Sequence, residues 1–217
     1  MTKRLHGSKL STCTQRVMLV LNELGLPYEL VSIDMGKAEH KTPKFVREMH
    51  PFGKLPALED GSLHLFESRA ICKYLVAKYA SPDSGMSLPE LPEDIAMYEQ
   101  AASVEYSYFD TSVFKLAYEK KFKEFFGRGE ADSTVVETME AEFRGVLDYY
   151  EELLSRQTYV TGDEVSLVDL YHLPWLHFLP QLSMEAEVSS RRYVAAWYQR
   201  MQQRPAWQKV AYPRLSN

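Results

Sequence analysis

Apolar residues near the start of the chain follow two different periods, one typical of strands and one typical of helices. Residues 28–33 alternate and are rich in strand formers, which predicts a strand. Between residues 12 and 24 the apolar positions recur every three or four residues, which predicts a helix with one buried face. Gly25 is well placed as the C-terminal cap of this helix, and Pro27 prevents its continuation.

The rest of the first third of the chain alternates between strands and helices in the same way. In chain order, the expected segments are a faint strand at residues 5–6, a short helix at 42–48, strands at 57–59 and 63–66, and a helix at 68–79. Asp60-Gly61 lies between the last two strands and is a strong signal for a hairpin. The predicted order is βαβ, then a helix, then ββα, which describes an α/β domain over residues 1–80.

The remainder of the chain has a different pattern. Prolines, serines and a glycine at residues 81–92 predict a linker. Beyond it no clear strand pattern occurs, and apolar residues recur at helical spacing over three stretches, residues 95–109, 136–154 and 193–204. Pro205 is expected to stop the last helix, and Ser166 followed three residues later by Asp169 predicts a capped helix start. We therefore expect an all-helical domain over residues 93–217.

Composition and charge narrow the class of protein. The 217 residues are 45% hydrophobic and 25% charged, with a net charge of -5 and no basic run typical of nucleic-acid binding. Two cysteines, Cys13 and Cys72, and no CxxC pair argue against a disulfide framework, a zinc ribbon or a dithiol redox motif. The N-terminus does not resemble a signal peptide, and no apolar run approaches the roughly 20 residues that span a bilayer. We expect a cytoplasmic protein that binds neither nucleic acid nor membrane.

Four short motifs occur along the chain in a characteristic order. They are STCTQRV at residues 11–17, PFGKLPAL at 51–58, LFESRAI at 65–71, and a segment that runs from Gly162-Asp163 to Asp169. Each motif alone is moderately specific, but the ordered combination resembles the glutathione transferases. The first motif is similar to the catalytic signature of the phi class, in which a serine opens the first helix. The resemblance covers the whole chain.

The resemblance implies a fold, an activity and an assembly. The fold is an α/β thioredoxin-like N-terminal domain, followed after the linker by an all-α C-terminal domain. The activity is conjugation of the glutathione thiolate to small hydrophobic electrophiles, with glutathione as co-substrate and no resident cofactor. A homodimer is implied, with Phe52 inserting into the partner subunit. No metal site is expected, because the six histidines are scattered and no GxGxxG or P-loop occurs.

Ser11 is the expected catalytic residue. A free thiol has a pKa of about 8.5, and lowering it by about two units requires roughly 3 kcal/mol of preferential stabilisation of the thiolate. A hydroxyl that donates to sulfur supplies about 1.5 to 3 kcal/mol, and a helix N-terminus adds about 0.3 to 2 kcal/mol. Considered locally, Ser11 is better explained as a plain helix cap. The four motifs together favour the catalytic role.

The resemblance also assigns the residues that hold glutathione. Leu55-Pro56 is expected to be a cis peptide whose backbone at Leu55 pairs with the cysteinyl part. Glu67 would take the γ-glutamyl ammonium, and Ser68, where a strand gives way to a helix, would take the γ-glutamyl carboxylate. The local alternative for Glu67-Ser68 is a plain helix cap. The glycyl carboxylate would pair with three side chains, Lys41, Lys54 and the neighbouring His40, although single lysines are usually only solvated.

The electrophile is expected to use the helical domain. Phe114 and Tyr118 are four residues apart and so share a helix face, a spacing that is more often found in core residues. The resemblance places these two residues, together with Leu10 and Met35, near the second substrate. This region departs most from the family pattern, so the identity of the electrophile stays open.

Two other functions compete with conjugation. A hydrophobic ligand carrier with little turnover would suit the 14 tyrosines and 10 phenylalanines. A thiol transferase would use Cys13, but related enzymes of that kind carry cysteine at the serine position. Two residues span roughly 200° around a helix, so Cys13 should point away from a thiol held at Ser11. Peroxide reduction beside conjugation also stays open.

Overall fold

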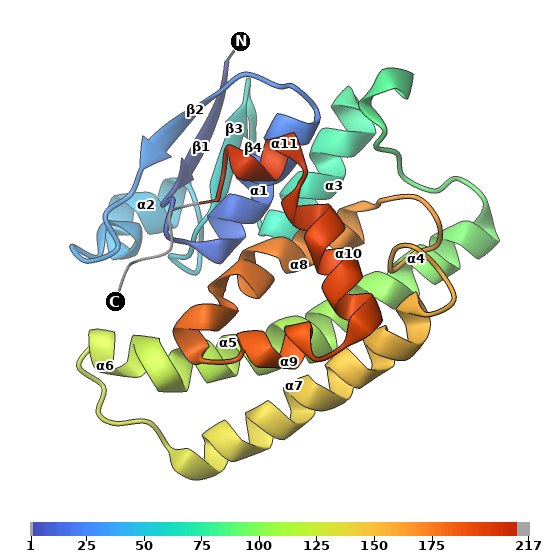
Figure 1. The fold of residues 1–217 in the computed structure, drawn as a ribbon. Helices are drawn as coiled ribbons and strands as arrows, with labels where there is room; N and C mark the ends of the chain where they lie inside the picture. The colour runs from blue at the N-terminus through green and yellow to red at the C-terminus, as the bar shows by residue number, and fades with distance from the viewer. Residues whose placement is uncertain (1, 212–217) are drawn as a thin grey trace. The chain divides into compact units, whose positions relative to one another are not determined.

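The structure is a computed structural model that describes residues 2–211. It separates into two compact units, one made of residues 2–88 and 203–211 and the other of Pro89–Gln202 (Figure 1). No helix among the described residues has both the length and the apolar character to cross a membrane.

The first unit contains a four-stranded sheet in the order β2-β1-β3-β4. The strands are β1 (Lys3–Gly7), β2 (Tyr28–Ser32), β3 (Ala57–Asp60) and β4 (Leu63–Phe66). Strand β1 runs parallel to β2, with Leu5 opposite Leu30, and antiparallel to β3, with Leu5 opposite Leu58. The sheet is therefore mixed. Leu5 and Leu58 are both buried, because alternate residues of the central strands face the core. This order and pairing confirm the predicted thioredoxin-like domain.

Three helices of the first unit, α1 (Thr12–Glu23), α2 (Pro43–Glu48) and α3 (Ser68–Tyr79), match their predicted segments closely. Two single turns, η1 (Glu39–Lys41) and η2 (Pro82–Ser84), were not predicted. Helix α1 packs beside α3, and their buried faces contribute Val17 and Ile71 to the core. The β1–α1 and β4–α3 connections therefore lead into the N-termini of two neighbouring helices.

The end of the chain differs from the prediction. Helix α10 (Arg192–Gln202) stops as expected, but Pro205 begins a further short helix, α11 (Pro205–Gln208). Proline suits a first helical position because its missing N–H would have no partner there. Helix α11 packs against α1, and Arg204 donates to the two carboxylate oxygens of Glu23 at 2.5 and 2.8 Å. Residues 203–211 thus belong to the first unit, although we expected a helical domain that continued to residue 217.

The second unit is helical, and no strand occurs between Pro89 and Gln202. Its elements are α4 (Pro92–Val104), η3 (Glu105–Asp110), α5 (Thr111–Ala117), η4 (Tyr118–Phe122), α6 (Lys123–Phe125), α7 (Ser133–Leu154), α8 (Leu167–Phe178), η5 (Leu179–Leu182), α9 (Glu185–Ser189) and α10. This confirms the all-α class of the domain. The wide π-helical turns η3 and η4 were not predicted, because periodicity of apolar residues does not separate them from ordinary helix.

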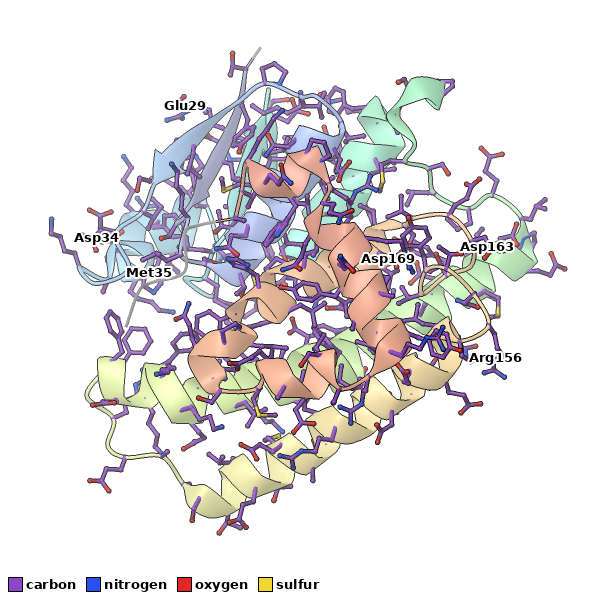
Figure 2. The ribbon with its side chains drawn as sticks, viewed as in Figure 1. Glu29, Asp34, Met35, Arg156, Asp163 and Asp169 are labelled. Carbon is purple, nitrogen blue, oxygen red and sulfur yellow. The ribbon has the colours of Figure 1, made fainter. Side chains whose placement is uncertain are left out.

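The start of α8 confirms the predicted cap. Ser166 accepts a hydrogen bond from the N–H of Val168, and the Asp169 carboxylate accepts from the backbone and hydroxyl of Ser166. Asp169, which is labelled in Figure 2, is buried. It also accepts hydrogen bonds from the N–H of Val160 and the indole of Trp197, each at 2.9 Å. Burial raises the pKa of Asp169, and these four donors oppose the rise. The network fixes α8 to α10 and to the preceding loop.

Candidate active site

Ser11 lies at the N-terminus of α1 as predicted. Its backbone is extended, and its Oγ accepts a hydrogen bond from the N–H of Thr14 at 3.3 Å. A hydroxyl has one donor hydrogen and two acceptor lone pairs, so capping leaves the hydrogen of Ser11 available. The side chain is half-buried and the first turn of α1 carries no acidic residue. The cap and the catalytic role are therefore compatible at this residue.

The two cysteines are both free and differ in their surroundings. Cys13 is half-buried in the first turn of α1, with its Sγ 3.6 Å from Nη1 of Arg16. Cys72 is fully buried in α3, where burial raises the pKa of its thiol to about 12. A thiol of that pKa is protonated at neutral pH, so Cys72 is a core residue.

The loop after α2 brings the predicted glycyl-binding residues together. Leu55-Pro56 is a cis peptide, as the resemblance implied. Gly53 has φ +56°, and a Cβ at this position would lie 2.7 Å from the carbonyl oxygen of His40. Lys41 donates from Nζ to the carbonyl oxygen of Phe52 at 3.3 Å. A glycine is thus what lets the loop approach η1, so that the two segments form one surface.

The charges on this surface favour an anion. Lys41 and Lys54 are both exposed. His40 is half-buried, and burial together with the neighbouring Lys41 lowers the pKa of its imidazole. Its Nδ1 is buried and has no hydrogen-bond partner among residues 2–211. The two lysines supply positive charge, while His40 is neutral at pH 7.

The β4–α3 corner holds Glu67 in an unusual conformation. Its φ of +70° lies in a region that costs a non-glycine residue about 1 to 3 kcal/mol. Glu67 is the residue before α3, yet its side chain does not cap the helix. The first N–H groups of α3 therefore have no acceptor in the side chain of Glu67. Ser68, in the first turn of α3, is buried. Backbone amides and a hydroxyl converge here, as anion binding at a helix N-terminus requires.

His50 joins this corner to the cis-proline loop, a role that our sequence analysis missed. It is buried, and its Nδ1 accepts from the N–H of Phe52 at 3.3 Å. In the neutral ring the proton is therefore on Nε2, which lies 3.9 Å from a carboxylate oxygen of Glu67. Burial lowers the pKa of His50 against the attraction of that carboxylate. The only sequence signal was its place just before the Pro51-Phe52 motif.

Arg16 joins the same corner to α1 and was likewise not among the predicted site residues. It is fully buried, and its Nη1 donates to Oγ of Ser68 at 2.8 Å. Arg16 and His50 therefore link three segments of the first unit, namely the Ser11 helix, the Glu67-Ser68 corner and the cis-proline loop.

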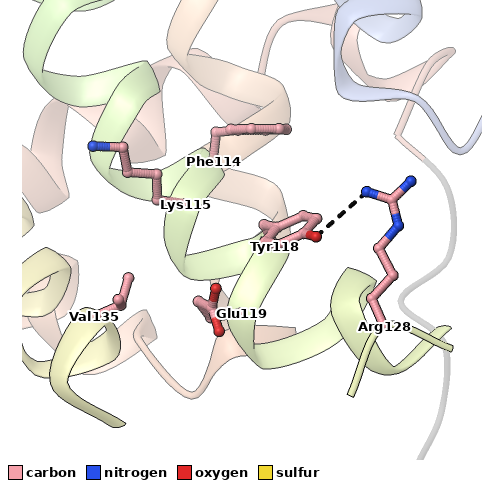
Figure 3. A pocket seen from close by; sticks show the side chains of 6 residues that line it. All are labelled: Phe114, Lys115, Tyr118, Glu119, Arg128 and Val135. Carbon is pink, nitrogen blue, oxygen red and sulfur yellow. Dashed lines mark hydrogen bonds between the residues drawn. The ribbon is translucent and has the colours of Figure 1, made fainter. Parts of the chain in front are cut away.

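A pocket in the second unit contains the two aromatic residues predicted to bind the electrophile. Its volume is about 260 Å³, and six residues line it (Phe114, Lys115, Tyr118, Glu119, Arg128 and Val135; Figure 3). Phe114 is 49% exposed, so it is not a core residue. Arg128 donates from Nη1 to the hydroxyl of Tyr118 at 3.4 Å. The carboxylate of Glu119 is already engaged by the N–H of Asp132 and by Lys123, both at 2.8 Å.

Leu10 and Met35 belong to the first unit, so their place beside this pocket stays a prediction. Leu10 is 64% exposed in the β1–α1 connection, and Met35 is half-buried after β2 (Figure 2). Within residues 2–211 no group of three histidine, cysteine or acidic side chains could hold a metal ion.

The sheet, the cis-proline loop and the helical second unit place the chain among proteins that pair a thioredoxin-like domain with an all-helical domain. The family profile for the glutathione S-transferase N-terminal domain matches residues 5–77, and that for the C-terminal domain matches residues 106–205. The chain therefore belongs to the glutathione S-transferase family. It is a transferase enzyme with glutathione as its substrate, as predicted.

Individual relatives agree with the phi-class resemblance. A glutathione S-transferase of Silene vulgaris is 42% identical over 97% of both chains. Glutathione transferase F7 of Populus trichocarpa has a solved structure that matches with a TM-score of 0.88 and 34% identity, covering 96% of this chain and 97% of that one. Glutathione S-transferase I from maize, solved with an atrazine glutathione conjugate, matches with a TM-score of 0.85 and 32% identity, covering 97% and 96%.

Proposed function

We propose that Ser11 is the catalytic residue and that its hydroxyl donates a hydrogen bond to the thiolate of glutathione. The observation that carries this proposal is the N-cap geometry of Ser11, which uses an acceptor lone pair and leaves the hydrogen free. The thiolate then attacks a small hydrophobic electrophile.

The expected stabilisation of the thiolate matches what the reaction needs. A charge-assisted hydrogen bond contributes about 1.5 to 3 kcal/mol, and the N-terminus of α1 contributes about 0.3 to 2 kcal/mol. No acidic residue in the first turn of α1 opposes the second contribution. The sum covers the roughly 3 kcal/mol that lowers a thiol pKa by about two units.

Glutathione would lie along the three linked segments of the first unit. The γ-glutamyl ammonium pairs with Glu67, and its carboxylate binds the α3 N-terminus at Ser68. The backbone of Leu55 before Pro56 pairs with the cysteinyl part. Support comes from the buried contacts that hold the corner beside the loop.

The glycyl carboxylate would meet the positive surface made by Lys41 and Lys54, assisted by His40. Support for this assignment comes from the close approach of the loop to η1 at Gly53. We assign the electrophile to Phe114 and Tyr118, with Leu10 and Met35. The maize relative with its bound atrazine conjugate supports an aromatic, apolar second substrate.

With a chloronitroaromatic electrophile the chemical step balances without a further reagent. The thiol proton leaves to water, the sulfur lone pair forms the new C–S bond, and the C–Cl bond breaks. Chloride departs with the bonding electrons. Ser11 keeps its proton throughout, because it stabilises the thiolate as a hydrogen-bond donor.

The test compares glutathione conjugation to 1-chloro-2,4-dinitrobenzene by the wild type, Ser11→Ala and Cys13→Ser. We expect Ser11→Ala to lose about 10- to 100-fold of kcat/KM, since one charge-assisted hydrogen bond is removed, and Cys13→Ser to keep its activity. Unchanged turnover in Ser11→Ala would refute the role of Ser11. Dependence on Cys13 would indicate a thiol transferase, and an inactive wild type that binds hydrophobic ligands would indicate a carrier.

Assembly and compartment are also part of the proposal. We propose a homodimer, for which Phe52, 69% exposed, offers an apolar side chain to a partner subunit. A monomer by light scattering at micromolar concentration would exclude it. We propose a cytoplasmic location, since both cysteines are free, as reducing compartments favour.

A further inference from the structure

We infer that Arg16 is a positioning residue that directs the hydroxyl of Ser68 toward the γ-glutamyl carboxylate of glutathione. This inference rests on the proposed function, because it takes Ser68 as the contact to that carboxylate. Arg16 itself lies behind Ser68 and does not need to touch the substrate.

The direction of the Arg16–Ser68 hydrogen bond follows from chemistry. A guanidinium group has only donors, so the Oγ of Ser68 must accept the 2.8 Å bond from Arg16. No other described residue takes the hydroxyl hydrogen of Ser68, and Ser68 is 5% exposed. A buried hydroxyl with an unused hydrogen requires an acceptor from outside the protein. That acceptor is best supplied by an anion.

Charge at the corner selects a carboxylate over an ammonium group. Arg16 is fully buried and has only hydrogen-bond donors, so beside Ser68 it offers no acceptor to an ammonium group. The first turn of α3, a 12-residue helix, carries no acidic residue, and its N–H groups point the same way. Glu67 departs from this pattern, but its side chain is 64% exposed and does not cap the helix.

The same nitrogen of Arg16 also contacts the first turn of its own helix, α1, which Ser11 caps. Nη1 of Arg16 lies 3.6 Å from Sγ of Cys13, and the thiol of Cys72 in α3 contacts the carbonyl oxygen of Arg16 at 3.7 Å. Arg16 therefore fastens the first turn of α1 to the first turn of α3. The separation between the Ser11 hydroxyl and the Ser68 hydroxyl, at the two ends of the γ-glutamyl-cysteinyl unit, depends on it.

The experiment compares two thiol substrates in four proteins. The substrates are glutathione and 4-aminobutyryl-cysteinyl-glycine, which keeps the amine and lacks the γ-glutamyl carboxylate. The proteins are the wild type, Arg16→Lys, Ser68→Ala and the double variant. Arg47→Lys serves as the matched control, because Arg47 is exposed and pairs with the neighbouring Glu48. Thermal unfolding checks that each variant is folded.

We expect Arg16→Lys to raise the KM for glutathione about tenfold, since lysine lacks the rigid fork of arginine, with a smaller change in kcat. The KM for the analogue should change less than about twofold, because the group that Arg16 serves is missing. In the Ser68→Ala background, Arg16→Lys should add less than about twofold, because the two residues act as one unit.

Equal losses for glutathione and for the analogue would overturn the inference and make Arg16 a packing residue. If Ser68→Ala raises the KM for glutathione and Arg16→Lys does not, the inference about Arg16 fails and the proposed role of Ser68 stands. If Ser68→Ala leaves both KM values unchanged, the proposed role of Ser68 fails first and the inference fails with it. If Arg16→Lys does not fold, Ser68→Ala still tests the inference through the ratio of the KM for the analogue to the KM for glutathione. An unchanged ratio would mean that the Ser68 hydroxyl does not bind the carboxylate, and the inference would fail.

Discussion

Replacing Gly53 by alanine has two costs that often occur together at a glycine: the cost of a positive φ for an L-residue and the cost of the contact that the added Cβ makes. Comparison with a second glycine separates them. Gly53 has φ +56°, and an added Cβ would lie 2.7 Å from the carbonyl oxygen of His40 and 3.0 Å from Cδ of Lys41. Gly61, in the β3–β4 turn, has φ +65° and nothing within 4 Å of an added Cβ. Gly61→Ala is therefore a matched control that changes the backbone preference and adds no contact.

The two substitutions should differ by the cost of the contact. A left-handed conformation costs an L-residue about 1 to 2 kcal/mol, partly offset by the reduced entropy of the unfolded chain, so Gly61→Ala should lose about 1 kcal/mol. At Gly53 the neighbouring atom is backbone and cannot rotate away, and forced overpacking adds about 1 to 3 kcal/mol. We expect Gly53→Ala to lose about 2 to 4 kcal/mol.

Urea unfolding followed by circular dichroism measures both losses in the free energy of unfolding. The KM for glutathione provides a second readout, because the loop must move away from His40 and Lys41 in Gly53→Ala but not in Gly61→Ala. We expect a KM increase of several-fold in Gly53→Ala only. Equal unfolding free energies and equal KM values for the two variants would refute the reasoning that the loop needs Gly53 for its close approach.

Two further predictions concern charge and the pocket. Burial of Asp60 opposes its ionisation, but hydrogen bonds from Tyr79, Tyr74 and Lys78 lower its pKa to about 2. The ionised Asp60 therefore stabilises the fold above pH 3.8, and this contribution is lost as the pH falls toward 2. Asp60→Asn should lose about 2 kcal/mol at pH 7 and show less change in unfolding free energy between pH 4 and pH 2 than the wild type; an unchanged pH profile would contradict this. Phe114→Ala should raise the KM for 1-chloro-2,4-dinitrobenzene about five- to tenfold through lost apolar burial, with the KM for glutathione unchanged. Phe125→Ala is the control, since Phe125 is 71% exposed and does not line the pocket, and an equal effect of both changes would exclude the pocket as the electrophile site.

Local pattern was enough to predict most elements and part of the site. Helix α3 begins at Ser68 and ends at Tyr79 as expected, because the strand-to-helix change of period is sharp there. Ser11 as a helix cap and the Ser166–Asp169 cap also followed from residues three apart in the chain. These features depend on hydrogen bonds within one helical turn, so a short window of sequence contains all the groups involved.

Contacts between distant segments could not be predicted in this way. His50 and Glu67 meet only because the cis-proline loop and the β4–α3 corner lie side by side. The positive φ of Glu67 violates its local preference and is held by the surrounding packing.

The alternation of strands and helices and the capping serine at the start of α1 followed from the sequence, because periodicity and capping are local. Only the tertiary structure decided that α11 returns to the first unit and that Arg16 donates to Ser68, 52 residues further along the chain. The physical reason is that a buried donor takes whichever acceptor the packed core places beside it, and sequence spacing carries no record of that partner.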